Sequence, residues 1–252
     1  MPLFSGAAIG LRAGGRAESL VPLAVAVLAL FWLRTPAESW VGSTPVKARS
    51  SEEIRLVRFA CLILTSVSAA ALLWLFRGGR NRELLWIGAL AAAALLGQTA
   101  IRRTWRKARG AAQMVGALGL TSVAAAAYYV VTDRLDWAAY SLWGLNFLFA
   151  ANQIQFVQLR IRAAHTKSAA EKIASGRAFL LAQTLTLALL AAGCFAHRIT
   201  WYVALAFLPV LWRGFAWYLA PFRPLAVHTL GKQELAHAIV FGVLLIALAA
   251  AA

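Results

Sequence analysis

Acidic residues are scarce in this sequence. Aspartate occurs only as Asp133 and Asp136, and nine acids in all stand against 25 lysines and arginines. A magnesium-diphosphate site needs several carboxylate ligands, so this shortage argues against one. Cysteine is equally rare, because Cys61 and Cys194 are isolated in apolar runs and form neither a disulfide framework nor a metal-type spacing. The sequence also lacks Gly-x-Ser-x-Gly, Cys-x-x-Cys and phosphate-loop motifs.

Apolar residues dominate what is present. They make up 62% of the chain, charged residues only 13%, and the mean hydropathy is +0.71. Such a composition indicates an integral membrane protein, because a bilayer core requires apolar runs of about 20 residues. The lysines and arginines that give the formal net charge of +16 lie in short loops between these runs. Basic loop residues of this kind set the topology of a membrane protein, so we expect no nucleic-acid partner.

The apolar runs predict an all-α transmembrane fold: one domain over residues 1–252, a multi-pass helical bundle of eight full spans plus a short first helix. The first run, residues 1–11, has half the length of a span, which suits a re-entrant piece or the rear half of a helix. The second, residues 20–33, reaches span length if it continues to Trp40, with Pro36 breaking or kinking it. The remaining spans are expected at residues 54–76, 84–101, 112–132, 137–160, 178–197, 200–219 and 235–252. Ser50 and Glu53 form a capping-box pattern before the third helix.

Lysine and arginine are concentrated in every second loop. If residues 1–11 count as the first helix, the loops after helices 2, 4, 6 and 8, with the adjoining helix ends, hold 18 of the 25 basic residues. The other loops hold 7. Because positive charge is retained on the cytoplasmic side, the bias predicts that the first set of loops is cytoplasmic.

Candidate binding residues cluster at the end of the span 137–160. The span contains five side-chain amides, at Asn146, Asn152, Gln153, Gln155 and Gln158. An amide inside an apolar helix costs several kcal/mol when it is unpaired, so these side chains line a cavity or bridge neighbouring helices. Arg160 and Arg162 follow, suited either to clamping an anionic head group or to marking topology. Arg34 and Glu38, four residues apart, are expected to pair. The candidate ligand-binding residues are Arg34, Glu38, Asn146, Asn152, Gln155, Arg160, Arg162 and Arg213.

Two segments suggest a first resemblance. Residues 44–51 (TPVKARSS) and 152–160 (NQIQFVQLR) are similar in place to functional loops of UbiA-type membrane prenyltransferases, whose second motif is Asn-Asp-x-x-Asp-x-x-x-Asp. Asn152 matches that motif, but its three acids are replaced by Gln153, Phe156 and Arg160. Magnesium cannot use phenylalanine or arginine as ligands, so the resemblance implies a UbiA-like architecture without magnesium-dependent prenyl transfer.

A closer resemblance is to the uncharacterised YwiC-like family of bacterial membrane proteins. It rests on residues 31–38 (FWLRTPAE), 158–162 (QLRIR) and 230–234 (LGKQE), and it implies a bacterial cytoplasmic (inner) membrane location. That family usually begins with a basic residue and a His-Gly-Ala-Trp segment, whereas this chain opens at Met1-Pro2-Leu3. The absence of that segment fits the half length of the first run, and a misplaced start codon and a real truncation would look the same.

Three functions are compatible with the sequence. The first is binding of an isoprenoid, quinone or phospholipid-like ligand at a cytoplasmic-side cavity, with no metal and no cofactor, whether or not a reaction follows. The second is a non-catalytic accessory or scaffolding subunit with a protein partner in the membrane. The third is a transporter, although neither an inverted repeat nor a pair of broken helices is visible. Glu234 and His237 have the Glu-x-x-His spacing of metal bundles, but one such pair does not make a metal site.

Overall fold

The computed structural model describes residues 1–40, 50–77, 79, 82–105, 108–165, 168–220 and 226–250. All regular elements in these ranges are helices, so the expected all-α class is confirmed. The elements are α1 (Pro2–Arg12), α2 (Leu20–Trp40), α3 (Ser51–Arg77), α4 (Arg82–Thr104), α5 (Arg109–Thr121), α6 (Val123–Thr132), α7 (Trp137–Arg162), η1 (Ala163–His165), α8 (Ala169–Phe195), α9 (Trp201–Ala204), η2 (Leu205–Phe207), α10 (Leu208–Leu219) and α11 (Val227–Ala249). Residues 44–49 of the first UbiA-like segment lie outside the described residues, as do Lys47, Arg49, Arg80, Arg106, Lys107, Lys167 and Arg223 of the charge count.

Seven helical segments of the described chain are long and apolar enough to cross a membrane: α2, α3, α4, α5 with α6, α8, α9 to α10, and α11. The chain is therefore a multi-pass membrane protein. The remaining expected span, at residues 137–160, corresponds to α7. This helix has 26 residues but is not among the seven. Its five amides lower its hydropathy, and its length still suffices to cross a bilayer.

Several helix boundaries differ from the prediction. The last helix begins at Val227, eight residues before the expected start at 235, and α8 begins nine residues before 178. Both predictions were wrong because they began each helix at its apolar run, whereas polar first turns are also helical. Ser168 caps α8 by accepting a hydrogen bond from the backbone N–H of Glu171 at 3.2 Å. Pro36 lies inside α2, which continues to Trp40.

Other local predictions are confirmed. The capping box at the start of α3 is present: the Glu53 N–H donates to Ser50 Oγ at 3.1 Å, and the Ser50 N–H donates to the Glu53 carboxylate at 3.2 Å. The span predicted at 112–132 is present but is interrupted at Ser122, whose hydroxyl donates to the Gly119 carbonyl at 2.7 Å.

The centre of the bundle is α6, where residues 124–131 are all buried. The short α1 packs directly on it, because Gly6 has no side chain and a Cβ there would lie 2.1 Å from the Ala124 carbonyl oxygen. The far end of α1 is tied to α11, where Arg12 donates to the Ile246 carbonyl at 2.7 Å. The first run thus forms a helix of 11 residues that is held between α6 and α11.

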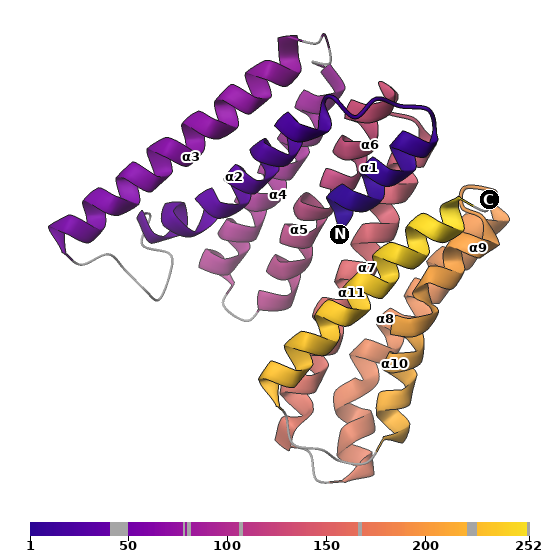
Figure 1. Ribbon diagram of the computed structural model, residues 1–252. Helices are drawn as coiled ribbons and strands as arrows, with labels where there is room; N and C mark the ends of the chain where they lie inside the picture. Colours follow the sequence, from indigo (N-terminus) through magenta and orange to yellow (C-terminus); the bar gives the residue numbers. More distant parts are fainter. Residues whose placement is uncertain are drawn as a thin grey trace.

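Figure 1 shows α2 and α3 at one edge of the bundle, α1, α6 and α7 in the middle, and α8, α10 and α11 at the other edge. The helices alternate in direction, so the last residues of α2, α4, α7 and α10 meet the first residues of α3, α5, α8 and α11 at one end. We call this end the basic end, because the loops there are those with the larger share of lysine and arginine.

Candidate functional site

A buried polar centre lies between α7, α8, α10 and α11, and we define it by Asn152, Gln183, Arg213 and Glu234. Asn152 and Gln183 are 4% and 0% exposed. The side chains of Arg213 and Glu234 are 11% and 13% exposed. Each of the four residues comes from a different helix, so the centre exists only when these helices are assembled.

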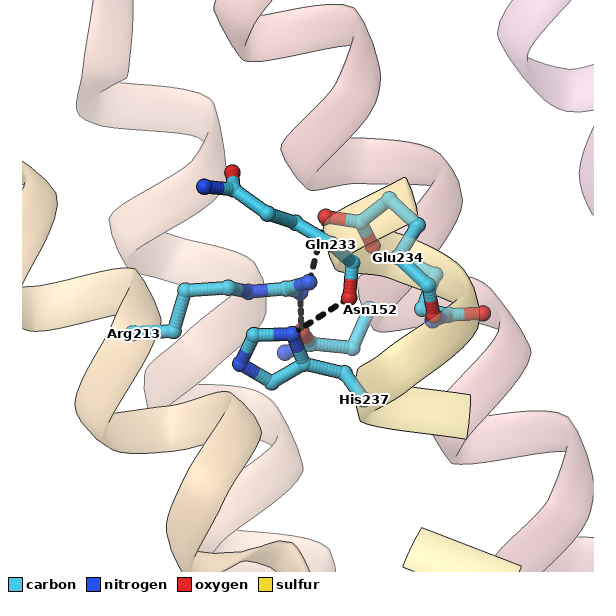
Figure 2. Close-up of polar contacts among 6 residues, drawn as sticks. Asn152, Arg213, Gln233, Glu234 and His237 are labelled. Atoms are coloured by element: carbon cyan, nitrogen blue, oxygen red, sulfur yellow. Dashed lines mark hydrogen bonds and ion pairs between the residues drawn. The ribbon is translucent and has the colours of Figure 1, made fainter. Parts of the chain in front are cut away.

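Hydrogen bonds join the four side chains into one chain of contacts. Arg213 Nη1 donates to Glu234 Oε1 at 2.5 Å, and its Nη2 lies 3.4 Å from Asn152 Oδ1. Asn152 Nδ2 in turn donates to Gln183 Oε1 at 2.7 Å. Figure 2 shows the Arg213 guanidinium between Glu234 and Asn152. An ion pair in an apolar bundle persists only with such additional hydrogen bonds, because desolvating both charges is costly.

Apolar groups shape the space around this centre. The Arg213 guanidinium lies 4.1 Å from the Phe156 ring centroid, an arrangement that favours a cation over the ring face. Residue 214 must be glycine for Gln183 to sit where it does, since a Cβ there would lie 1.7 Å from Gln183 Nε2. Phe156 therefore packs on the charged side chain of the centre.

Three polar atoms of the centre remain without a partner. Within the part of the chain that the structure describes, the buried side-chain atoms lacking a hydrogen bond are Gln183 Nε2, Arg213 Nε and Glu234 Oε2. An unpaired buried polar group costs about 1–3 kcal/mol, and more when it is charged. Two donors and one acceptor without a partner thus belong to side chains of the same hydrogen-bonded group.

The outer side of the centre is bordered by polar residues of α11. Figure 2 shows Gln233 and His237 on either side of the Arg213 guanidinium. The His237 Nδ1 lies 2.7 Å from the Gln233 carbonyl oxygen, one turn earlier. Gln153 of α7 donates to the backbone carbonyl of Glu234 at 2.8 Å and so fixes α11 against α7.

A second polar group, the α2–α4 cluster, lies near the basic end and consists of Arg34, Glu38, Gln98 and Arg102. The expected pair is confirmed, because Arg34 Nε donates to Glu38 Oε1 at 2.9 Å. Arg102 Nη1 lies 3.6 Å from the same oxygen. With its amide oriented to satisfy both neighbours, Gln98 accepts from Arg102 at 3.0 Å and from Arg34 at 3.2 Å. This cluster joins α2 to α4.

The other candidate residues belong to neither group. Asn146 is buried and donates to Ser5 Oγ of α1 at 3.1 Å and to the Leu142 carbonyl at 2.8 Å, which is a helix-packing contact. Gln155 is half-buried and makes no side-chain hydrogen bond within the described ranges. Arg162 is exposed, and its Nε donates to the Gln158 carbonyl one turn earlier at 3.4 Å. Arg160, half-buried, lies beyond Phe156 toward the basic end.

Four residues of the buried polar centre and the α2–α4 cluster were not among the sequence candidates: Gln98, Arg102, Gln183 and Glu234. Gln98 and Gln183 carried the same signal as the amides of α7, a polar side chain in the middle of an apolar helix. A polar side chain in the middle of an apolar run can be identified from the sequence in any of the helices.

A pocket of about 490 Å³ lies at the end opposite the basic end. Its lining includes Glu83, Trp86, Tyr129 and Tyr140, and Tyr129 donates to the Glu83 carboxylate at 3.0 Å. None of the sequence candidates lines it. A cytoplasmic-side cavity stays a prediction. In the described ranges no three histidine, cysteine or acidic side chains are placed to hold a metal ion.

These features define a polytopic α-helical membrane protein with a buried ion pair and amides between its C-terminal helices. The chain belongs to the YwiC-like family, whose model, described as YwiC-like protein, matches residues 1–128. No curated protein and no solved structure matches the chain. The matched residues cover α1 to α5 and most of α6, so the buried polar centre lies outside the matched part. The UbiA-like architecture stays a prediction.

Proposed function

We propose that this protein binds an isoprenoid, quinone or phospholipid-like molecule, with the polar head of the ligand at the buried polar centre and its tail along the apolar helices. The observation that carries the proposal is the group of three unpartnered atoms, Gln183 Nε2, Arg213 Nε and Glu234 Oε2. A bilayer provides no water to satisfy such groups, so a ligand that pairs with them gains their full hydrogen-bonding energy. Arg213, Asn152 and the apolar Phe156 surface would then hold the head in place.

The depth of the centre suits a lipid-like ligand. Glu234 lies seven residues into α11 and Arg213 six residues before the end of α10. At 1.5 Å per residue, both are roughly 10 Å from the basic end of their helices. A head at this depth leaves most of the bundle length beside it for an apolar tail. We further propose that the membrane is the bacterial inner membrane, with the basic end in the cytoplasm.

The remaining candidates receive more limited roles in this proposal. Arg34 and Glu38 join α2 to α4, and Asn146 joins α7 to α1. Gln155, Arg160 and Arg162 are rim residues that the ligand passes or that orient the protein. The proposal therefore depends on Arg213, Gln183 and Glu234, and only weakly on the arginines at the end of α7.

Native mass spectrometry of the purified protein tests this proposal. We expect a defined lipid-like adduct on the wild-type protein and on the control variant Arg134→Ala, which changes an exposed arginine at the end opposite the basic end. We expect its loss from Gln183→Leu and Arg213→Ala. Gln183→Leu removes a hydrogen-bond donor but leaves the ion pair of Arg213 and Glu234 in place. It therefore keeps the test informative if Arg213→Ala fails to fold. Equal adducts on all four proteins would contradict the proposal. A stoichiometric protein partner without any adduct would instead support an accessory subunit.

A further inference from the structure

The charge balance of the buried polar centre restricts which head group fits it. Arg213 already has a counter-ion, since Glu234 lies 2.5 Å from its Nη1. A buried lysine on these helices, Lys172 of α8, donates to the backbone carbonyls of Tyr218 and Ala220 at 3.3 and 2.6 Å, and lies over the Trp217 ring. Lys172 thus holds the end of α10. The centre as a whole is therefore close to neutral.

A phosphate head would fit this environment poorly. It brings one or two negative charges into a region where the guanidinium is already neutralised, and the Glu234 carboxylate would repel it. Buried anions require compensating cations, because desolvation in a low-dielectric interior disfavours an uncompensated charge. A diphosphate would be still less favourable.

The unpartnered atoms match a hydroxyl group instead. A hydroxyl accepts two hydrogen bonds and donates one. The centre offers two free donors, Arg213 Nε and Gln183 Nε2, and one free acceptor, Glu234 Oε2. These atoms belong to neighbouring side chains, since Arg213 contacts Glu234 and Asn152, and Asn152 contacts Gln183.

We propose, resting on the function proposed above, that the ligand head is an uncharged hydroxyl on an apolar tail. Arg213 and Gln183 donate to its oxygen, and it donates to Glu234. An isoprenoid alcohol and a quinol both carry this group, and the test below separates them. Glu234 acts as the selectivity residue, because its charge makes the centre neutral and so excludes phosphate.

The test uses the full-length protein in phosphatidylcholine nanodiscs, with radiolabelled farnesol as the probe. We expect unlabelled farnesol or a farnesyl-substituted benzoquinol to displace the probe at about tenfold lower concentration than farnesyl phosphate. Whichever of the first two displaces it more effectively identifies the source of the hydroxyl, and either result supports the inference. The three competitors carry the same tail, so the comparison isolates the head.

Glu234→Gln gives the second arm of the test. It leaves the Arg213 charge uncompensated, so we expect the preference to shift by about tenfold toward farnesyl phosphate. Glu52→Gln, at the exposed first turn of α3, removes one negative charge far from the centre and should shift nothing. The wild-type comparison decides the inference by itself if Glu234→Gln does not fold.

The outcomes are separable. Tighter binding of farnesyl phosphate than of farnesol by the wild-type protein would overturn the inference and leave the proposed function standing. An unchanged preference in Glu234→Gln would also overturn it. If folded wild-type protein binds neither labelled farnesol nor labelled farnesyl phosphate, and carries no other adduct in native mass spectrometry, the proposed function fails as well.

Discussion

At the scale of single residues, Gly214 decides whether the amide of Gln183 can reach the centre. A Cβ at position 214 would lie 1.7 Å from Gln183 Nε2 and 3.1 Å from the Phe179 ring. We predict that Gly214→Ala destabilises the folded protein by about 1–3 kcal/mol through overpacking, seen as a lower Tm in detergent. The same change should release the bound ligand, because Gln183 must move.

Gly231→Ala is the matched control for that substitution. Gly231 also lies in a helix, α11, but a Cβ there meets no atom within 4 Å. Alanine has the higher helix propensity, so this variant should be unchanged or more stable by up to about 1 kcal/mol. A Tm for Gly214→Ala equal to that of Gly231→Ala would show that Gln183 is not held as the structure places it.

Asn146 gives a second prediction, because the structure assigns it to packing. Its amide donates to Ser5 Oγ at 3.1 Å, between α7 and α1. A double-mutant cycle of Ser5→Ala and Asn146→Ala should yield a coupling free energy of about 0.6–1.7 kcal/mol, as for other interhelical hydrogen bonds in membranes. Ligand occupancy in native mass spectrometry should be unchanged. Loss of the adduct in Asn146→Ala alone would place Asn146 in the binding site.

Some of these contacts could be predicted from sequence, and others could not. Arg34 and Glu38 are four residues apart, and helix geometry alone brings such residues together. Asn152 and Gln183 are 31 residues apart on different helices. Their pairing depends on how α7 and α8 are rotated about their axes, and helices that are apolar on all sides give no periodicity from which to read that rotation.

At the scale of elements, apolar runs located the helices but not their ends. The start of α11 contains Lys232, Gln233 and Glu234, which an apolar-run criterion excludes although they are helical. This matters for the site, because it places Glu234 two turns inside α11 instead of in a loop. Ser168, by contrast, caps α8 through a side chain that a capping rule identifies from sequence.

The α2–α4 cluster yields a prediction about these two elements. Glu38 accepts from Arg34 and lies 3.6 Å from Arg102, so it links the last turns of α2 and α4. Removing it leaves Arg34 and Arg102, which also donate to the side-chain oxygen of the buried Gln98, without their shared carboxylate acceptor. We expect Glu38→Ala to cost about 1–3 kcal/mol and to speed hydrogen exchange at the end of α2, measured by mass spectrometry.

Glu52→Ala serves as the control, since Glu52 is exposed at the start of α3. It should leave exchange in α2 unchanged. Slower or equal exchange at the end of α2 in Glu38→Ala would mean that the cluster does not hold α2 against α4.

At the scale of the whole molecule, the family match and the buried polar centre lie in different parts of the chain. The match covers residues 1–128, whereas Asn152, Gln183, Arg213 and Glu234 all follow it. Family membership therefore says little about this centre. Sequence supplied the all-α class and the alternation of charge between loops, because both depend on composition and local order. The assembly of four helices around one ion pair depends on long-range packing, which a single sequence does not display.

The charge alternation leads to a prediction of orientation. Ser51, at the first turn of α3, lies at the basic end, and Thr200, before α9, lies at the opposite end; both are exposed. Since 18 of the 25 basic residues belong to the loops of the basic end and adjoining helix ends, that end should remain in the cytoplasm. In a protein whose Cys61 and Cys194 are replaced by alanine, a membrane-impermeant maleimide added to intact bacterial spheroplasts should label Thr200→Cys and not Ser51→Cys. Disrupting the membrane should make both positions reactive, which controls for accessibility. Labelling of Ser51→Cys alone in intact spheroplasts would reverse the orientation and place the buried polar centre nearer the outer face.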